Sequence, residues 1–399
     1  MMKLCEYNRD NNTSILKIFG ITLYKKVTDY KTTMRTQKFL YGLISTCKIA
    51  DKDGYRTEKN IKVLGIPLIK RIDEPEKISW YLWKLKYKET SLQKIFIKKY
   101  FQYFSPENDD IYILNANSGE IYLFLTYIFD VLRKKNGSKN PLFIATKKYH
   151  TELVKMIHPE VSCVYIPHFY RKIESKTFTA KNYRFFTVFP QNYFANVEHI
   201  IKTNPINSKH YFDFIMEQFD IKPEEIELKH ITVPNASKNR MLKKIKKIDL
   251  NLNNFIFLSP EAASCELLDN SFWIKLIKGF QDKGYDVFIN IVNNIPEFEN
   301  FKSCYLTYSE AFALAQKAKR IISLRSGFTE FLLQTNVPMD VIYTKFKDRH
   351  LFRDMDINYV TAGFSINKLP FINNNLINEI VIKDNNNENM CSNTILEKL

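Results

Sequence analysis

The chain has 399 residues, of which 45% are hydrophobic and 26% charged, a composition that excludes a disordered protein and favours more than one folded domain. Its 59 Lys and Arg residues exceed its 43 Asp and Glu residues, giving a net charge of +16 that predicts attraction to an anionic partner. The six cysteines form no CxxC pair and do not cluster with histidines, so neither a zinc site nor a disulfide framework is expected.

The N-terminus contains no apolar core of the kind found in signal peptides. No run in the chain approaches the roughly 18 apolar residues of a membrane-spanning helix. We therefore expect a cytoplasmic protein that is soluble or bound peripherally to a membrane.

Residues 1–105 differ in texture from the rest and predict a separate N-terminal extension. One phrase occurs twice, as IFGITLYKK at 18–26 and as VLGIPLIKR at 63–71, which indicates two similar strand-turn pieces. The stretch 78–104 mixes aromatic residues with lysines and predicts aromatic and basic helices. These helices either lie at an anionic membrane surface or dock on the protein core through their aromatic residues.

After Pro106, short apolar strands alternate with helices, which predicts parallel sheets with crossover helices. Residues 106–240 carry strands at 111–114, 142–145, 161–166 and 185–189, and residues 241–372 carry strands at 255–258, 287–290, 321–324 and 341–343. A charged segment at 221–250 links the two series, and Ser309 is placed to cap a helix over 310–318. Residues 373–399 are rich in Asn and predict a mobile tail.

Two segments that follow strands of the second series stand out, because ligands of such sheets bind at the carboxyl ends of the strands. They are SPEAAS at 259–264 and LRSGFTE at 324–330. In the second, Arg325, the Ser326 hydroxyl and the free amides of a helix start predict a diphosphate site, with Gly327 allowing close approach. Arg325→Ala should then abolish donor binding and leave the fold intact. The alternative is that Arg325 pairs with a carboxylate and that Ser326 and Gly327 form a tight turn.

The strand-turn-helix series at 111–134, 255–283 and 309–345 resembles the GT-B glycosyltransferases of bacterial surface-polysaccharide biosynthesis (capsule or lipooligosaccharide), in a heptosyltransferase-like arrangement. The resemblance implies an α/β fold with two Rossmann-like domains whose parallel sheets face each other across a cleft. It also implies transfer of a sugar from a nucleotide-activated donor to a growing surface glycan or lipid-linked acceptor. The LRSG phrase departs from the Asp, Gly, Pro and His cluster of heptosyltransferases, which leaves the donor sugar open. The acceptor side falls on Asn117, Ser118 and Gly119, and the donor and phosphate side on Ser259, Glu261, Ser264, Arg325, Ser326, Gly327 and Glu330.

Inverting transfer requires a base for the acceptor hydroxyl, and Glu120 at a helix start is the first candidate, with His150 the second. The alternative for Glu120 is a carboxylate that the helix dipole stabilises. The alternative for His150 is a structural side chain that forms hydrogen bonds. Arg325 and helix amides could stabilise the leaving phosphate without a metal, so no cofactor beyond the nucleotide-sugar is expected. Asp354-Met355-Asp356 matches an Asp-x-Asp metal motif, but a surface loop is the alternative.

Two other classes of protein remain open at this point. One is a non-catalytic GT-B-like protein that binds glycans or assembles partners. The other is a basic nucleic-acid-binding protein, although the sequence contains no RRM, KH, zinc-finger or helix-turn-helix phrase. The expected partners are a nucleotide-sugar donor, a glycan or glycolipid acceptor and an anionic membrane surface, with no nucleic acid.

Overall fold

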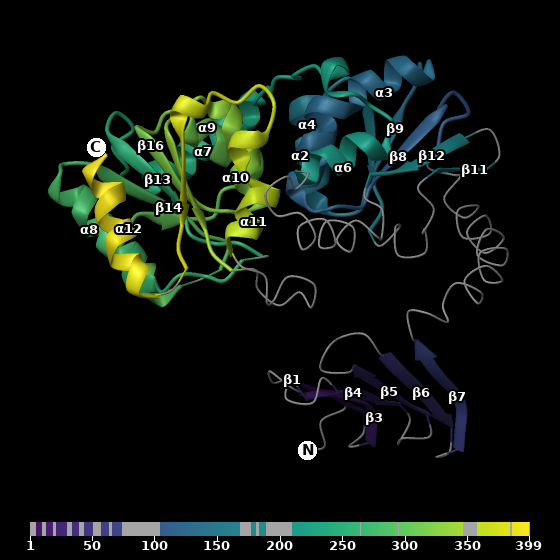
Figure 1. The fold of residues 1–399 in the computed structure, drawn as a ribbon. Helices are drawn as coiled ribbons and strands as arrows, with labels where there is room; N and C mark the ends of the chain where they lie inside the picture. The colour runs from purple at the N-terminus through teal and green to yellow at the C-terminus, as the bar shows by residue number, and fades with distance from the viewer. Residues whose placement is uncertain are drawn as a thin grey trace. The chain divides into compact units, whose positions relative to one another are not determined.

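In the computed structural model, the chain divides into two compact units, Met1–Ile95 and Phe96–Leu399, each of which is described by itself (Figure 1). The structure describes the backbone of seven strands between residues 5 and 73 and of one strand at 177–180. It further describes residues 104–167, 183–188, 210–263, 265–293, 295–345, 357–383 and 385–398. The boundary between the units therefore falls before the boundary expected at residue 105.

The first unit contains an antiparallel sheet in which each strand pairs with the next along the chain. Each copy of the repeated phrase spans two neighbouring strands. The two copies pair in the same register, because Ile18 pairs with Ile21 in the first copy and Val63 with Ile66 in the second, each near a bulge. The expectation of two similar strand pieces is confirmed, whereas the stretch 78–103 lies outside the described residues. The strands are β1 (Cys5–Arg9), β2 (Thr13–Ile18), β3 (Ile21–Asp29), β4 (Met34–Phe39), β5 (Ile44–Ala50), β6 (Thr57–Val63) and β7 (Ile66–Asp73).

The second unit begins with a sheet in the order β10-β9-β8-β12-β11, parallel except for β11 at its edge. Its abundant aromatic residues form a core: the ring of Tyr112 stacks on Phe186 at 5.0 Å and meets Phe129 edge-on at 5.2 Å. The strands are β8 (Asp110–Leu114), β9 (Leu142–Ala145), β10 (Ser162–Tyr165), β11 (Thr177–Ala180) and β12 (Tyr183–Thr187). The helices are α2 (Ser118–Leu123), continued by the π-helix η3 (Phe124–Ile128) and α3 (Phe129–Asn136), then α4 (Lys148–Ile157) and α6 (Tyr211–Gln218).

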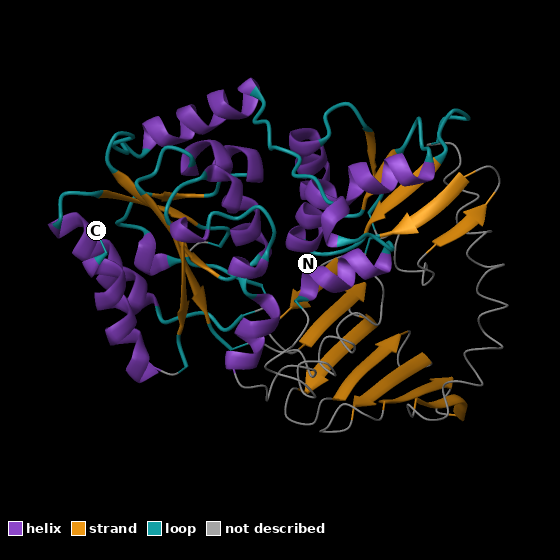
Figure 2. Ribbon diagram, turned by 45° about the horizontal axis from the view of Figure 1, so that its top comes forward, coloured by secondary structure: helices purple, strands orange, loops and turns teal. Residues whose placement is uncertain are grey.

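A second, fully parallel sheet follows in the order β15-β14-β13-β16-β17-β18, which is the Rossmann order 3-2-1-4-5-6. All residues of β13 are buried, as expected for a sheet covered by helices on both faces (Figure 2). The expected fold class of two Rossmann-like α/β sheets beside an N-terminal extension is therefore confirmed. The strands are β13 (Phe255–Ser259), β14 (Asp286–Asn290), β15 (Ser303–Cys304), β16 (Arg320–Leu324), β17 (Met339–Tyr343) and β18 (Ile377–Val381); the helices are α7 (Asn235–Lys247), α8 (Asn270–Asp282), α9 (Tyr308–Ala315), α10 (Gly327–Leu332), α11 (Ile357–Phe364) and α12 (Asn385–Glu397). Short 3-10 turns are η5 (Pro223–Glu225), η6 (Pro296–Phe298), η7 (Leu333–Thr335), η8 (Ile366–Lys368) and η9 (Asn374–Leu376).

We call the first of these two sheets with its helices the first half of the second unit, and the second sheet with its helices the second half. Helix α7, in the segment expected to link the two halves, lies entirely within the second half. It packs against α9, where Arg240 and Lys244 form ion pairs with Glu310 at 3.1 and 2.6 Å. The hydroxyl groups of Ser237 and Ser309 lie 2.9 Å apart in the same contact. The sequence-based boundary at 240/241 therefore cuts through a helix that the structure keeps in one piece.

Residues 373–383 and 385–398 form part of the second sheet and its helical cover, and the expectation of a mobile tail at 373–399 was wrong. Strand β18 pairs along its length with β17, and Ile380 and Ile395 are buried. Helix α12 packs on α8, where a Cβ atom placed on Gly279 would lie 2.6 Å from Leu396 Cδ1. The few apolar residues that anchor this segment are widely spaced, so its Asn-rich composition concealed them.

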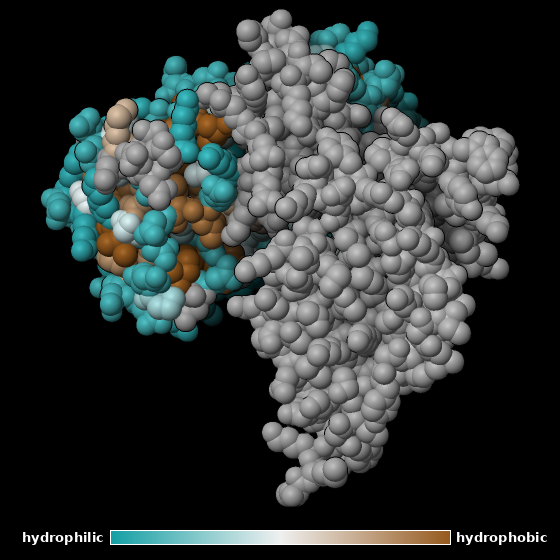
Figure 3. Space-filling view, turned by 60° about the horizontal axis from the view of Figure 1, so that its bottom comes forward, coloured by the Kyte–Doolittle hydropathy of each residue, from teal (hydrophilic) through white to brown (hydrophobic). Residues whose placement is uncertain are grey.

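Seven large hydrophobic side chains are exposed among the described residues of the second unit. Figure 3 shows one face on which hydrophobic residues of this unit emerge among hydrophilic ones. Among the helices in the part of the chain that the structure describes, none is long and apolar enough to cross a bilayer. The exposed residues are Tyr165, Leu242, Leu267, Val292, Tyr305, Phe371 and Met390.

Candidate functional site

The strand order places a candidate site at the carboxyl ends of the two parallel sheets. Ligands of Rossmann sheets bind where the strand order reverses, which in the second half is between β13 and β16. The segments that follow these strands are the two that the sequence singled out, 259–264 and 324–330. In the first half, the segment after β8 contains Asn117, Ser118 and Gly119.

Helices α2 and α10 begin against each other, so that residues predicted from both halves meet. A Cβ atom placed on Gly327 would lie 2.6 Å from Ser118 Oγ and would overlap the backbone nitrogen of Gly119. A Cβ atom placed on Gly119 would lie 2.9 Å from Gly327 Cα and would overlap the Glu330 carboxylate. Only glycine permits so close an approach of two backbones. We call this junction the α2–α10 contact.

Glu330 is buried beside the α2–α10 contact and joins the two halves through its carboxylate. Its Oε1 atom accepts a hydrogen bond from Arg325 Nη2 at 2.6 Å and another from the hydroxyl of Tyr211. Tyr211 belongs to α6 of the first half, and its ring centroid lies 5.8 Å from the guanidinium carbon of Arg325. A buried carboxylate needs such charged and polar partners, since burial alone strongly disfavours its charge.

Arg325 uses its other donors within the protein as well. Its Nε and Nη1 atoms donate to the carbonyl oxygens of Phe364 at 3.3 Å and Ser326 at 3.0 Å. Burial opposes the positive charge, but the Glu330 carboxylate outweighs it and holds the pKa of Arg325 well above its ordinary value. This arrangement corresponds to the alternative considered from the sequence, in which Arg325 pairs with a carboxylate. A role for Arg325 as a phosphate ligand stays a prediction.

The turn between β16 and α10 is closed by side chains of its own residues. The backbone N–H of Ser326 donates to Thr329 Oγ1 at 3.1 Å, and Thr329 Oγ1 donates to the carbonyl oxygen of Leu324 at 2.9 Å. Ser326 is the N-cap of α10. The Ser326 amide is therefore engaged within this turn, which is the tight-turn arrangement that the sequence also allowed.

The start of α9 receives a carboxylate from the first half. Glu152 on α4 accepts hydrogen bonds from the backbone N–H of Ser309 at 3.0 Å, from Thr307 Oγ1 at 2.6 Å and from the Ser309 hydroxyl. The N-cap is Thr307, whose N–H bonds to Glu310 Oε2 at 3.1 Å, so the expectation that Ser309 caps this helix was wrong. The helix dipole stabilises a negative charge at this position. Glu152 is therefore a second link between the halves.

Tyr308 completes the junction between the halves. Its ring stacks on Tyr149 with centroids 5.5 Å apart, and burial raises its pKa to about 12 although a hydrogen bond with Ser118 acts the other way. Sequence reasoning missed Tyr308, Tyr211 and Glu152 because their contacts join distant parts of the chain. The only local signal was the helix start beside Tyr308, which the sequence had already indicated.

The loop after β13 is tied to the loop after β14 through Glu261. The Glu261 carboxylate accepts hydrogen bonds from the backbone N–H groups of Val292 and Asn293 and from the Asn293 side chain. Ser259 is buried at the end of β13, and Ser264 lies outside the described residues. Glu261 therefore lies at the carboxyl end of β13, bonded on its β14 side, and is partly exposed there.

The two candidate bases occupy different environments. Glu120 lies in the first turn of α2 and is partly exposed. His150 has no exposed surface, and no hydrogen bond of acceptable geometry reaches either ring nitrogen from the described residues. Burial, with a smaller contribution from Lys147, lowers the pKa of His150 to about 3, so the ring is neutral near pH 7. The placement of His150 gives no support to direct proton transfer, and Glu120 stays the predicted base.

Side chains of metal-ligating type do not gather in the described part of the second unit. Among the residues described with their side chains, no group of three or more His, Cys, Asp or Glu is placed to hold a metal ion. Asp354 and Asp356 of the Asp-x-Asp triplet lie outside the described residues. Independence from metal ions therefore stays a prediction.

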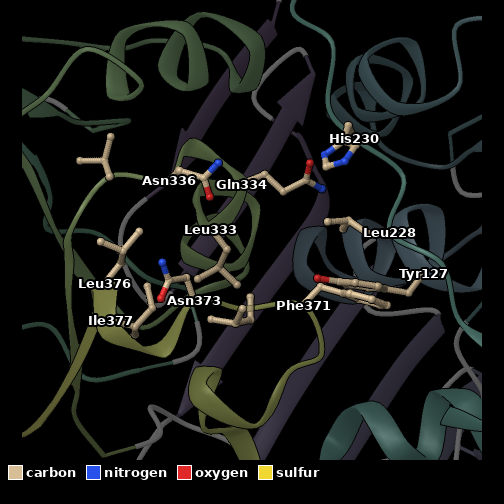
Figure 4. Close-up of a pocket in the computed structure, with 12 residues that line it drawn as sticks. Tyr127, Leu228, His230, Leu333, Gln334, Asn336, Phe371, Asn373, Leu376 and Ile377 are labelled. Atoms are coloured by element: carbon tan, nitrogen blue, oxygen red, sulfur yellow. The ribbon is translucent and has the colours of Figure 1, made fainter. Parts of the chain in front are cut away.

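One pocket lies at the opposite end of the second sheet. It is bordered by Asn336 and Val337 before β17, by Ile377 at the start of β18, and by Tyr127 and Phe371. The rings of Tyr127 and Phe371 stack with centroids 6.1 Å apart and planes 9° from parallel, and they lie face to face in Figure 4. Because these are the amino ends of the strands, the pocket is distinct from the position at which Rossmann sheets bind ligands.

No protein-family model matches the chain, and no curated protein sequence matches it. Among solved structures, a family 9 glycosyl transferase from Veillonella parvula is similar over 72% of this chain and 89% of its own, with 12% identity and a TM-score of 0.44. The E. coli ADP-heptose LPS heptosyltransferase II is similar over 73% of this chain and 97% of its own, with 13% identity and a TM-score of 0.45. The E. coli heptosyltransferase WaaC, solved with ADP, is similar over the same shares, with 9% identity and a TM-score of 0.42. These similarities concern the general arrangement of strands and helices only.

Proposed function

We propose that the chain is a glycosyltransferase that moves a sugar from a nucleotide-activated donor to a growing surface glycan or a lipid-linked acceptor. The observation that supports this proposal is the convergence of carboxyl-end loops from two α/β halves at the α2–α10 contact. A transferase has to hold two substrates with their reacting atoms close together. Two such halves provide one surface for each substrate.

The donor is assigned to the second half, because its strand order is that of nucleotide-binding Rossmann sheets. We place the nucleotide between the loop with Ser259 and Glu261 and the turn with Arg325, Ser326 and Gly327. A partly exposed carboxylate such as Glu261 can accept hydrogen bonds from the donor's hydroxyl groups. Phosphate charge would be stabilised by Arg325 and the helix amides, without a metal.

The acceptor is assigned to the first half, beside Asn117, Ser118 and Gly119. Glu120 stands in the first turn of the same helix, within the segment where an acceptor hydroxyl would approach the donor. We assign it the role of general base, which removes the proton of that hydroxyl during transfer.

Donor binding requires the α2–α10 contact to open. In the structure, Ser118 and Gly119 fill the space in front of Gly327, and the Glu330 carboxylate accepts a hydrogen bond from Arg325 Nη2. We infer that separation of the two halves frees Arg325 for phosphate, and that closure then excludes water, as in many transferases and kinases.

Binding of nucleotides tests the donor assignment. The melting temperature of the full-length protein is measured with UDP, GDP, CMP and ADP, and we expect one of them to raise it. Glu261→Gln should weaken that nucleotide's affinity about tenfold, which corresponds to a lost charge-assisted hydrogen bond. Glu297→Gln, on an exposed residue of the same half, is the matched control and should bind like the wild type. Equal affinity of both variants would remove Glu261 from the site.

A second function is favoured by the same contact. Because Arg325 is engaged by Glu330 and two carbonyl groups, a non-catalytic protein that binds glycans or assembles partners would also use this arrangement. Such a protein would release no nucleotide from any sugar-nucleotide and would show no thermal shift with the four nucleotides. Either positive result argues against this alternative.

A further inference from the structure

The pocket at the amino ends of β17 and β18 is bordered by three irregular pieces of backbone. Tyr127 belongs to the π-helix η3, and π-helical turns inside α-helices often mark functional sites. Asn336 and Phe371 have positive φ angles of 56° and 58°, which are uncommon for residues other than glycine. For the bulky side chain of Phe371 this conformation is strained, and such strain gathers at functional positions such as ligand-binding sites. We call this cavity the Tyr127–Phe371 pocket.

Hydrogen bonds around the Tyr127–Phe371 pocket hold its walls in place. The carbonyl oxygen of Thr126 in η3 accepts a hydrogen bond from the backbone N–H of Lys229 at 2.9 Å. The Gln334 side chain donates to the carbonyl oxygen of Lys229 at 3.0 Å, and the Tyr127 hydroxyl donates to the carbonyl oxygen of Pro370 at 3.3 Å. The pocket is therefore formed before a ligand arrives, which is usual for small-molecule sites.

The pocket combines an open aromatic face with side chains that can still form hydrogen bonds. Phe371 is 59% exposed although one face of its ring stacks on Tyr127, so its other face is open to a ligand. Among the described residues, no hydrogen-bond partner engages the side chains of His230 and Asn336, which border the same pocket. Figure 4 shows these two side chains along one edge of the pocket and the stacked rings along another. A ligand here meets a flat apolar surface beside donors and acceptors of hydrogen bonds.

The charges around the pocket narrow the class of ligand. None of the described residues that border it is Asp, Glu, Lys or Arg, although the whole chain has a net charge of +16. The neighbouring Lys229 is already paired with Asp130 and Glu160, each at 3.6 Å. A phosphate or carboxylate group would therefore find no lysine or arginine to balance its charge. The ligand that fits is neutral and has both an apolar face and several hydroxyl groups.

We propose that the Tyr127–Phe371 pocket binds one neutral sugar ring of a glycan, at a site separate from that of the proposed sugar transfer. The C–H groups on one face of a pyranose rest on the open face of Phe371, because the face of an aromatic ring is electron-rich. The sugar's hydroxyl groups form hydrogen bonds with Asn336 and His230. For an enzyme that extends a glycan, a second sugar site raises the effective concentration of the acceptor. That use rests on the proposed function, whereas sugar binding itself does not.

Saturation-transfer NMR on the full-length protein tests this proposal, with lactose, maltose, methyl N-acetylglucosaminide and methyl mannoside as probes. We expect at least one probe to be saturated, most strongly at the C–H protons of one ring face. Phe371→Gly removes the aromatic ring and suits the left-handed backbone, so this variant should fold and should lower that probe's affinity about tenfold. Asn336→Gly also suits its backbone and should lower the affinity about fivefold, as expected for one lost hydrogen bond.

The matched control removes an exposed aromatic ring elsewhere in the second unit. Tyr165 on β10 is 49% exposed and does not border the pocket, so Tyr165→Ala should bind the probe like the wild type. Glu120→Gln, on the acceptor side of the proposed transfer site, should also keep the wild-type affinity for the probe. Far-UV circular dichroism and the thermal transition check that all four variants fold.

Three results would overturn the proposal. The first is a wild type that saturates none of the four probes. The second is equal affinity of Phe371→Gly and Tyr165→Ala for the probe, because the Phe371 ring would then take no part in binding. The third is a loss of sugar binding in Glu120→Gln but not in Phe371→Gly, which would place the sugar on the acceptor side and support the transferase function. Nucleotide binding and release are measured separately, so the two proposals can fail independently.

Discussion

Arg325 and Glu330 depend on each other, because each is buried and each is the other's opposite charge. Removing one partner of a buried ion pair leaves an uncompensated charge and costs about 3–5 kcal/mol. We therefore expect Arg325→Ala to lower the free energy of unfolding by that amount, measured by urea denaturation. This differs from the expectation drawn from the sequence, in which Arg325→Ala affected donor binding alone.

A double variant separates charge pairing from lost packing. Glu330→Gln removes the carboxylate that Arg325→Ala leaves unpaired, so Arg325→Ala with Glu330→Gln should regain a substantial part of the lost stability. If the double variant unfolds as readily as Arg325→Ala alone, the ion pair is not the source of the destabilisation.

Two buried histidines make the stability of the second unit depend on pH. Burial lowers the pKa of His150 and of His210 from 6.5 to about 3, with cations adding to the effect. Since these groups take up protons more readily when unfolded, their contribution to stability is complete above about pH 6.5 and is lost as the pH falls toward 3. His150→Leu should reduce the slope of unfolding free energy against pH by about 1.4 kcal/mol per pH unit between pH 6 and pH 4. An unchanged slope in denaturation at several pH values would show that His150 titrates normally.

At the scale of elements, the α2–α10 contact depends on two glycines. A methyl group on Gly327 would meet the backbone of Gly119, which no change of rotamer can relieve. Gly327→Ala should therefore force the two helix starts apart and cost about 1–3 kcal/mol of stability, the range for overpacking. A variant that melts at the wild-type temperature would indicate that the halves do not rest on each other in solution.

The C-terminal segment is a second test at this scale. Because β18 is a strand of the second sheet and α12 covers α8, a chain that ends at Ile372 should lose its cooperative thermal transition or become insoluble. A mobile tail could be removed without such an effect. A truncated protein that melts within a few degrees of the full chain would restore the sequence-based interpretation.

Much of this fold could be predicted because the central strands of both sheets are buried and read as short apolar runs, such as Ile111–Leu114 and Phe255–Ser259. The same reasoning found the loops at their carboxyl ends. The contacts between those loops could not be predicted: Tyr211 and Glu330 are 119 positions apart and Glu152 and Ser309 are 157 apart. No local pattern records such pairings, which arise only when the two halves pack.

At the scale of the whole second unit, the two halves rest against each other at the point where the proposed substrates would meet. Gly119, Glu330 and Tyr211 hold this point closed. Sugar transfer at this position therefore implies a cycle of opening and closing, which commonly sets the turnover of such enzymes. We propose that a nucleotide-sugar enters this opening and is cleaved there.

Release of free nucleotide from a sugar-nucleotide is the direct test of this cleavage. The full-length protein is incubated with UDP-, GDP-, CMP- and ADP-linked sugars, with and without EDTA, and free nucleotide is measured over time. We expect slow release from one donor, unchanged by EDTA and reduced at least a hundredfold in Glu120→Gln, in line with the loss of a general base. Absence of release from every donor, together with no thermal shift by any of the four nucleotides, would contradict sugar transfer by this protein.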